Sequence, residues 1–184
     1  MKSSSREEAM KLHRKHGTSE RIVKHCETVA GVAMILVDGY TRRGIAVDSA
    51  SVAEAALLHD IGRNLTQGPT HGHEGAELLK REGASEIVVE TVRRHVGAGL
   101  SPQEAAALGL PPLVFIPETT EQVIVCFADK MIDSDRVRPF ELEVERFRLK
   151  GHDVGRLMAL KERVTRDLGE DPEALIFGKL KASR

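Results

Sequence analysis

Apolar side chains recur every three or four positions along most of this chain, which is the spacing of one helix face. The clearest run comprises Ile22, His25, Val29, Val32 and Leu36. Capping Ser, Asp and Thr residues precede such runs, and Gly residues end them. We predict helices over residues 6–15, 19–44, 48–60, 71–83 (or from His73), 85–96 and 119–132, a short helix after Pro102, and more after Pro139. The fold class is therefore all-α.

Composition agrees with a soluble helical protein and narrows its partners. Of the 184 residues, 41% are hydrophobic, 30% are charged and 3% are aromatic. The formal net charge of −1 argues against a nucleic-acid polymer or a membrane as partner, because both attract basic proteins. No apolar run reaches the ~18 residues of a membrane span, and no signal-peptide pattern opens the chain. Cys26 and Cys126 lie in apolar helical runs, so we expect buried free thiols in a cytoplasmic protein.

The adjacent pair His59-Asp60 is the most informative feature. It ends an apolar helical run and is followed by Ile61, Gly62 and Arg63. An unpaired carboxylate buried at such a place costs several kcal/mol or more. A bound metal ion is the simplest partner for both side chains.

Further ligand-type side chains lie on the core-facing sides of other predicted helices. These are His25, His95 and Asp129, each preceded by apolar or small residues one turn earlier. His71 and His73 compete for one more position, where a loop becomes a helix. Several buried polar groups that cannot satisfy one another indicate a shared ion.

Charge indicates how many ions the site would hold. Four neutral imidazoles and two carboxylates carry a formal charge of −2, so two divalent ions leave a positive site suited to an anionic phosphate ester. Mixed imidazole and carboxylate ligands favour iron, manganese, cobalt or zinc, with iron or manganese preferred. Asp60 would bridge the two ions.

Several nearby residues are candidates for substrate contact. Arg63 is expected to face the same cleft, where its guanidinium could grip phosphate oxygens and assist catalysis. Lys130, Asp133 and His73 are weaker candidates for substrate binding; Lys130 should point about 100° away from Asp129, and Asp133 should lie one turn beyond it. We expect the remaining basic side chains to be solvated, namely Arg93, Arg94, His13, His16 and His152.

In these residues the chain resembles the HD superfamily of metal-dependent phosphohydrolases, and most closely its small archaeal His-Asp-Ile-Gly proteins. The similarity covers about residues 19–135, with 1–18 as an N-terminal helix and 136–184 as a C-terminal helical extension packed on the same domain or mediating a homodimer. The resemblance implies a helical bundle and selects His71 over His73. It also implies two ion sites, the first formed by His25, His59, Asp60 and Asp129 and the second by Asp60, His71 and His95.

The expected function is hydrolysis of a nucleotide, a dinucleotide or a related phosphate ester by a hydroxide bound at the dinuclear site. The Gly-Tyr-Pro signature of the cyclic-dinucleotide phosphodiesterases in this superfamily is missing. Two alternatives stay open. The same ligand pattern occurs in mixed-valent di-iron oxygenases of this superfamily, and a non-catalytic nucleotide sensor could keep an intact metal site.

Overall fold

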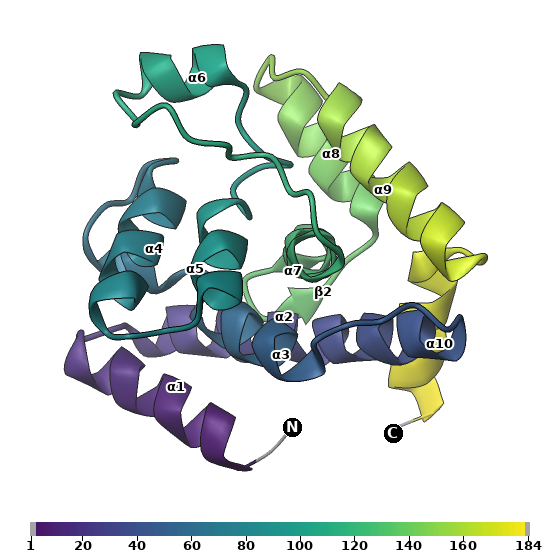
Figure 1. Cartoon of the computed structure of the whole chain (residues 1–184). Helices are drawn as coiled ribbons and strands as arrows, with labels where there is room; N and C mark the ends of the chain where they lie inside the picture. Colours follow the sequence, from purple (N-terminus) through teal and green to yellow (C-terminus); the bar gives the residue numbers. More distant parts are fainter. Residues whose placement is uncertain (1–2, 183–184) are drawn as a thin grey trace.

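Ten α-helices, one 3₁₀ turn and one two-stranded hairpin make up the part of the chain that this computed structural model describes, which is residues 3–182 for the backbone and 6–182 for the side chains (Figure 1). The helices are α1 (Ser3–Lys15), α2 (Glu20–Arg42), α3 (Ser49–Leu58), α4 (His71–Arg81), α5 (Glu86–Arg93), α6 (Pro102–Ala107), α7 (Thr120–Lys130), α8 (Phe140–Leu149), α9 (Gly155–Leu168) and α10 (Pro172–Ala182). The turn η1 (Ile61–Asn64) follows α3. The all-α prediction is confirmed.

Side-chain caps explain why several helices begin where they do. Asp48 accepts hydrogen bonds from the backbone N–H groups of Ala50 and Ser51 at the start of α3. Ser101 and Thr119 form capping boxes at α6 and α7, which satisfy N–H groups that have no partner within the helix. Ser19 has the extended backbone of a cap before α2, but its hydroxyl makes no capping bond.

The core surrounds α7, which is seen end-on in the middle of Figure 1 with α2, α3 and α5 on one side and α8 and α9 on the other. Every residue of α7 from Gln122 to Ala128 is buried, so this helix has no solvated face there. The C-terminal helices belong to the same core: the ring of Phe140 stacks on that of Phe127, with centroids 4.9 Å apart. Both cysteines are buried and free, as expected.

A short antiparallel hairpin corrects the prediction for the end of α7. Strands β1 (Ile132–Asp133) and β2 (Arg136–Val137) pair Ile132 with Val137 and Asp133 with Arg136. The helix therefore ends at Lys130, and Asp133 does not lie one helical turn beyond Asp129. The turn between the strands holds Ser134 at φ +60°, the one positive φ among the described non-glycine residues.

Two side chains expected in solvent are buried instead. His13 is 2% exposed, and its ring contacts the backbone oxygen of Leu57 at 2.8 Å. Arg93 is 5% exposed and forms ion pairs with Glu77 and Glu90. The prediction for His13 was wrong because its partner, the Leu57 carbonyl, is distant in sequence. The prediction for Arg93 was wrong because Glu77 and Glu90 neutralise it inside the protein, whereas a run of charged residues in a sequence normally indicates a solvated helix face. Within the described residues, no helix is both long and apolar enough to cross a membrane.

Candidate metal centre

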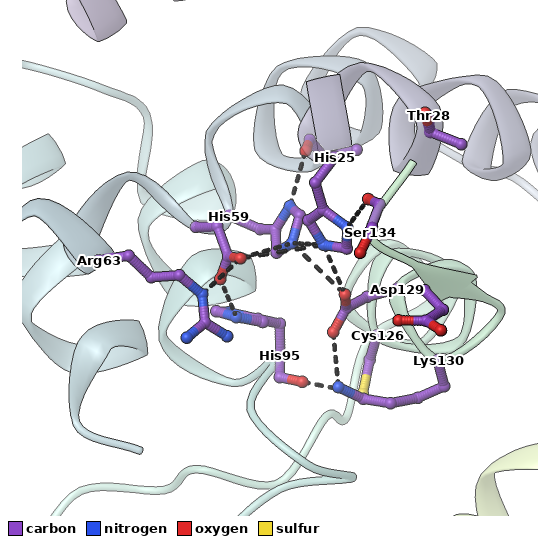
Figure 2. Close-up of polar contacts among 12 residues, drawn as sticks. His25, Thr28, His59, Arg63, His95, Cys126, Asp129, Lys130 and Ser134 are labelled. Carbon is purple, nitrogen blue, oxygen red and sulfur yellow. Dashed lines mark hydrogen bonds and ion pairs between the residues drawn. The ribbon is translucent and has the colours of Figure 1, made fainter. Parts of the chain in front are cut away.

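Six imidazole and carboxylate side chains meet where five helices end or pass. Figure 2 labels four of them, His25, His59, His95 and Asp129. The six come from five places in the chain: His25 from α2, His59 and Asp60 from directly after α3, His71 from the start of α4, His95 from beyond α5, and Asp129 from the last turn of α7. His59, Asp60, His71 and His95 are buried, and His25 and Asp129 are partly exposed. The structure thus brings together all six residues that the sequence singled out as metal ligands.

A backbone carbonyl orients each of the four imidazole rings. The Nδ1 atoms lie 2.7–2.9 Å from the oxygens of Ser134, Ala56, Gly68 and Val92 for His25, His59, His71 and His95, respectively. A carbonyl oxygen only accepts hydrogen bonds, so each Nδ1 must carry the proton. In a neutral ring the Nε2 atom then presents a lone pair. This is the tautomer that a metal-binding histidine uses.

The four Nε2 atoms face one another in two pairs. His25 and His59 Nε2 are 3.1 Å apart, and His71 and His95 Nε2 are 3.0 Å apart. Asp129 Oδ1 lies 3.0 Å from His25 Nε2 and 3.5 Å from His59 Nε2. The first pair and Asp129 therefore form a three-donor group.

Asp60 stands between the two pairs of rings. Its Oδ1 lies 3.0 Å from His71 Nε2 and 3.5 Å from His95 Nε2. Its Oδ2 lies 3.9 Å from the Nε2 atoms of both His25 and His59. Its two oxygens thus face different groups, as the bridging role requires.

These donor atoms suit a bound cation, because without one they leave a buried oxygen unpaired and bring lone pairs close together. Asp60 Oδ1 is buried and has no hydrogen-bond partner among the described residues, although the imidazole Nε2 atoms are near. Lone pairs that face lone pairs repel, and an orphaned carboxylate oxygen costs free energy. Bound cations remove both penalties, so the residues present suit the metal ions that the sequence pattern implies.

The groups of the centre change one another's charge states. Burial opposes protonation of His25, but the hydrogen bond to Asp129 outweighs it and raises the pKa of His25. Burial also opposes protonation of His59, but Cys26 and Asp60 outweigh it and raise the pKa of His59 well above its usual range.

Burial lowers the pKa of His95 to about 4, so this ring is neutral at pH 7. Burial opposes ionisation of Asp60 and Asp129, but neighbouring groups outweigh it and hold both pKa values well below the usual range. Lys130 contributes most at Asp129, with its Nζ 2.5 Å from Oδ2.

Two glycines allow the segment after Asp60 to touch the start of α4. A Cβ atom on Gly62 would lie 2.1 Å from the carbonyl oxygen of His71 and 2.5 Å from the backbone nitrogen of Gly75. Real Cβ atoms never come so close, and backbone atoms cannot move aside cheaply. The Gly62–Gly75 contact therefore places His71 beside Asp60.

The four residues predicted to contact the substrate lie at different places around this centre. Arg63 donates from Nε to Asp60 Oδ2 at 2.6 Å. Lys130 does not point away but reaches back to Asp129. Asp133 lines the neighbouring cavity, half exposed and paired with Arg146 at 3.4 Å. His73 bonds to Arg93 Nη1 at 2.7 Å, away from the six donors.

A cavity of about 300 Å³ opens beside the donors. Its walls carry four cationic side chains, Arg21, Arg63, Lys130 and Arg146, and four carboxylates, Asp60, Asp129, Asp133 and Glu143. Sequence reasoning missed Arg21 and Arg146 because neither lies near a recognisable motif. It also missed Ser134, whose contribution is a backbone carbonyl and leaves no signal in residue type.

Comparisons with known proteins agree with this geometry. The family model described as HD domain matches residues 22–132. The tRNA (cytidine(56)-2'-O)-methyltransferase of Thermoplasma volcanium is 35% identical over 163 residues, which is 88% of this chain and 47% of that protein. The chain thus spans about half the length of this relative.

Two further relatives match shorter segments of the chain, and one solved structure has a similar fold. An uncharacterized protein of Methanocaldococcus jannaschii is 43% identical over 114 residues, 62% of this chain and 68% of that protein. Ribonuclease Y of Cutibacterium acnes is 34% identical over 79 residues, 41% of this chain and 14% of the enzyme. The crystal structure of the HD domain of the L. monocytogenes phosphodiesterase PgpH superposes with a TM-score of 0.60 at 16% identity, covering 94% of this chain and 98% of that domain. The chain belongs to the HD domain family.

Proposed function

We propose that this protein is a metal-dependent phosphohydrolase that acts on a nucleotide, a dinucleotide or a related phosphate ester. The observation that carries the proposal is the convergence of four imidazole Nε2 atoms on the two oxygens of Asp60, one of which has no hydrogen-bond partner among the described residues. The centre lies beside a cavity that His25, Asp60 and Asp129 line together with four cationic side chains. Membership of the HD domain family supports a metal-dependent hydrolase in general terms. The class of substrate and the identity of the metal go beyond this family-level support and belong to our proposal.

The residues would divide the work as follows. His25, His59 and Asp129 would hold one divalent ion and His71 and His95 the other, with Asp60 between them. Such ions, when bound, activate water and withdraw charge from a phosphoryl group. Arg63 neutralises charge that builds on the phosphate oxygens, and its bond to Asp60 keeps that carboxylate oriented. Lys130 keeps Asp129 ionised.

RNA is a second candidate substrate, and the names of two relatives favour it. A ribonuclease and a tRNA-modifying enzyme both match this chain. A phosphodiester of RNA would present the same scissile group to the same donors. We do not propose methyl transfer, because the match covers less than half of the methyltransferase.

The decisive experiment compares Asp60→Ala with the wild type after loading with Mn²⁺, Fe²⁺, Co²⁺ or Zn²⁺. Hydrolysis of bis(p-nitrophenyl) phosphate, of p-nitrophenyl phosphate and of a nucleotide panel is measured beside metal content. We expect turnover and bound metal to be lost together, whereas Asp38→Ala, at an exposed position of α2, keeps both. An Asp60→Ala protein with normal turnover and metal content would refute the proposal. Oxygen consumption that depends on substrate would favour an oxygenase, and nucleotide binding without turnover a sensor.

A further inference from the structure

Three cavities lie in series along the β1–β2 hairpin. The first is the metal cavity of about 300 Å³ described above. The second, the hairpin cavity of about 30 Å³, shares Lys130, Asp133 and Arg146 with it. The third, the α10 cavity of about 740 Å³, shares Arg138 with the second. The three cavities therefore follow one another along the hairpin from the metal donors to α10, with Arg138 between the second and the third. We call the surface that they form the path.

Cationic side chains dominate this path. Besides the metal ligands, seven cations and three carboxylates line it. The cations are Arg21, Arg63, Lys130, Arg136, Arg138, Arg146 and Lys181, and the carboxylates are Asp133, Asp135 and Glu143. Bound divalent ions would make the path still more positive, so it fits a polyanion.

Four of these cations have no ion-pair partner. Within residues 6–182, no carboxylate oxygen lies within 4.0 Å of Arg21, Arg136, Arg138 or Lys181, although many other surface cations of the protein are paired. Arg146 is 47% exposed, and its contacts with Asp133 and Glu143 are long, at 3.4 Å and 3.3 Å. The unpaired guanidinium and ammonium groups of Arg21, Arg136, Arg138 and Lys181 are available to bind phosphate.

The α10 cavity combines this charge with apolar walls. Val137, Phe177 and Leu180 line it, and Arg136, Arg138 and Lys181 stand at its edge. An aromatic side chain beside a basic groove is the arrangement with which proteins bind single strands, because a base stacks on the ring while its phosphate contacts the cations. None of the six metal donors lines this cavity.

We propose that the path binds single-stranded RNA, with one phosphate at the metal centre, the strand along the hairpin and a base against Phe177. This inference rests on the proposed function and selects its second substrate class. The net charge of −1 does not oppose it, since the sum over the whole chain conceals a local excess of unpaired cations.

The test measures binding of a fluorescein-labelled single-stranded RNA 12-mer by fluorescence anisotropy over a range of salt concentrations. The triple variant Arg136→Met, Arg138→Met, Lys181→Met is compared with the control Arg14→Met, Lys80→Met, Arg81→Met, which removes three exposed cations outside the path. We expect the path variant to bind at least tenfold more weakly at low salt. The slope of log K against log salt should fall by about 2, since each lost phosphate contact accounts for about 0.7. The control should match the wild type.

A second variant tests the stacking platform. Phe177→Leu keeps an apolar side chain for the core and should weaken binding by about tenfold. Circular dichroism melts show that each variant is folded. The RNA duplex of the same sequence should bind weakly, because its paired bases cannot stack on a side chain.

Measurements of hydrolysis distinguish the RNA-binding proposal from the phosphohydrolase proposal on which it rests. The path variant should raise KM for the RNA 12-mer and leave turnover of bis(p-nitrophenyl) phosphate unchanged. Equal RNA binding by the path and control variants, or binding of the duplex or of a DNA 12-mer as tight as that of the RNA, would overturn the RNA path. In that case, intact turnover of the small diester would leave the phosphohydrolase proposal standing, whereas its absence under every metal would contradict that proposal itself.

Discussion

Single contacts decide what each side chain of the centre can do. The tautomer of each histidine ring is set by one backbone carbonyl, as with Ser134 for His25. Asp60 differs from a surface aspartate because both of its oxygens face rings and Arg63 holds one of them. The residue type supplies the donor atom, and the neighbour supplies its direction.

Arg63 offers a test at this scale. Arg63→Met should lower turnover about 100-fold, the loss typical of removing one group that stabilises transition-state charge. Metal content should not change, because Arg63 is not among the proposed ligands. Arg81→Met, at the exposed end of α4, is the control for loss of charge. Loss of metal together with activity would show that Arg63 acts only by orienting Asp60 and would contradict its role in stabilising charge on the phosphate.

Helix ends, more than helix faces, build the centre. Five of the six donors lie at the end, at the start or just beyond a helix, where the backbone can approach a neighbouring element. The approach of η1 to α4 depends on Gly62 and Gly75, for which the structure leaves no room for a Cβ. This contact gives the His-Asp-Ile-Gly pattern a physical reason for its glycine.

Gly62→Ala should therefore lower both stability and metal retention, although Gly62 is not a ligand. The added methyl would push η1 from α4, at a cost of about 1–3 kcal/mol in stability for forced overpacking. Metal retention should fall because His71 moves away from Asp60. Gly31→Ala in α2 meets no atom within 4 Å and should stabilise the protein by about 0.5–1 kcal/mol. Urea unfolding and metal analysis measure both; equal behaviour of the two variants would be evidence against the close contact.

The cap of α3 gives a second test at the scale of elements. Hydrogen bonds from Ser51 lower the pKa of Asp48 below its ordinary 3.8. The folded state thus favours the ionised form, so this contribution is complete above the unfolded pKa and disappears as the pH falls through the folded one.

Asp48→Ala should cost about 0.5–2 kcal/mol at pH 7. Asp48→Asn keeps an acceptor and should lose less. Below about pH 3 the difference between wild type and the Asn variant should shrink, because the protonated carboxyl is a poorer acceptor. Urea unfolding at pH 7 and pH 3 measures this, and a difference that grows in acid would contradict it.

At the scale of the whole molecule, donors from five helices share one centre, so metal binding and folding must be coupled. The unfolded chain cannot assemble six donors spread over residues 25–129, and ions therefore bind the folded state preferentially. The C-terminal helices take part, since Phe140 packs on Phe127 of the same helix that carries Asp129.

Removal of the metal should consequently lower Tm. Protein treated with a chelator should melt at a lower temperature, and Mn²⁺ should restore Tm until the site saturates. A free metal concentration of 100 times Kd stabilises the folded state by about 2.7 kcal/mol. Asp60→Asn should show little of this shift. A Tm insensitive to Mn²⁺, Fe²⁺, Co²⁺ and Zn²⁺ alike would contradict a structural coupling between the ions and the fold.

The helices, their caps and the family were readable from local patterns. Helical spacing depends only on neighbours within one turn, and the His59-Asp60 pair followed by Ile61 and Gly62 is a specific signature. The same local reasoning was wrong for His13 and Arg93, because charge in a sequence does not reveal a distant partner such as the Leu57 carbonyl. It also extended α7 past Lys130, where short strands have no periodic signal.

By itself, the sequence determined which side chains lie on core-facing helix sides, and hence which donors are candidates for a metal. Only the tertiary structure decided their mutual distances, the tautomer of each ring and the cationic path along the hairpin. The reason is physical: periodicity records how a residue faces its own helix, whereas a site arises where separate elements meet. Arg21, Arg136, Arg146 and Lys181 belong to four different elements, and no local pattern relates them.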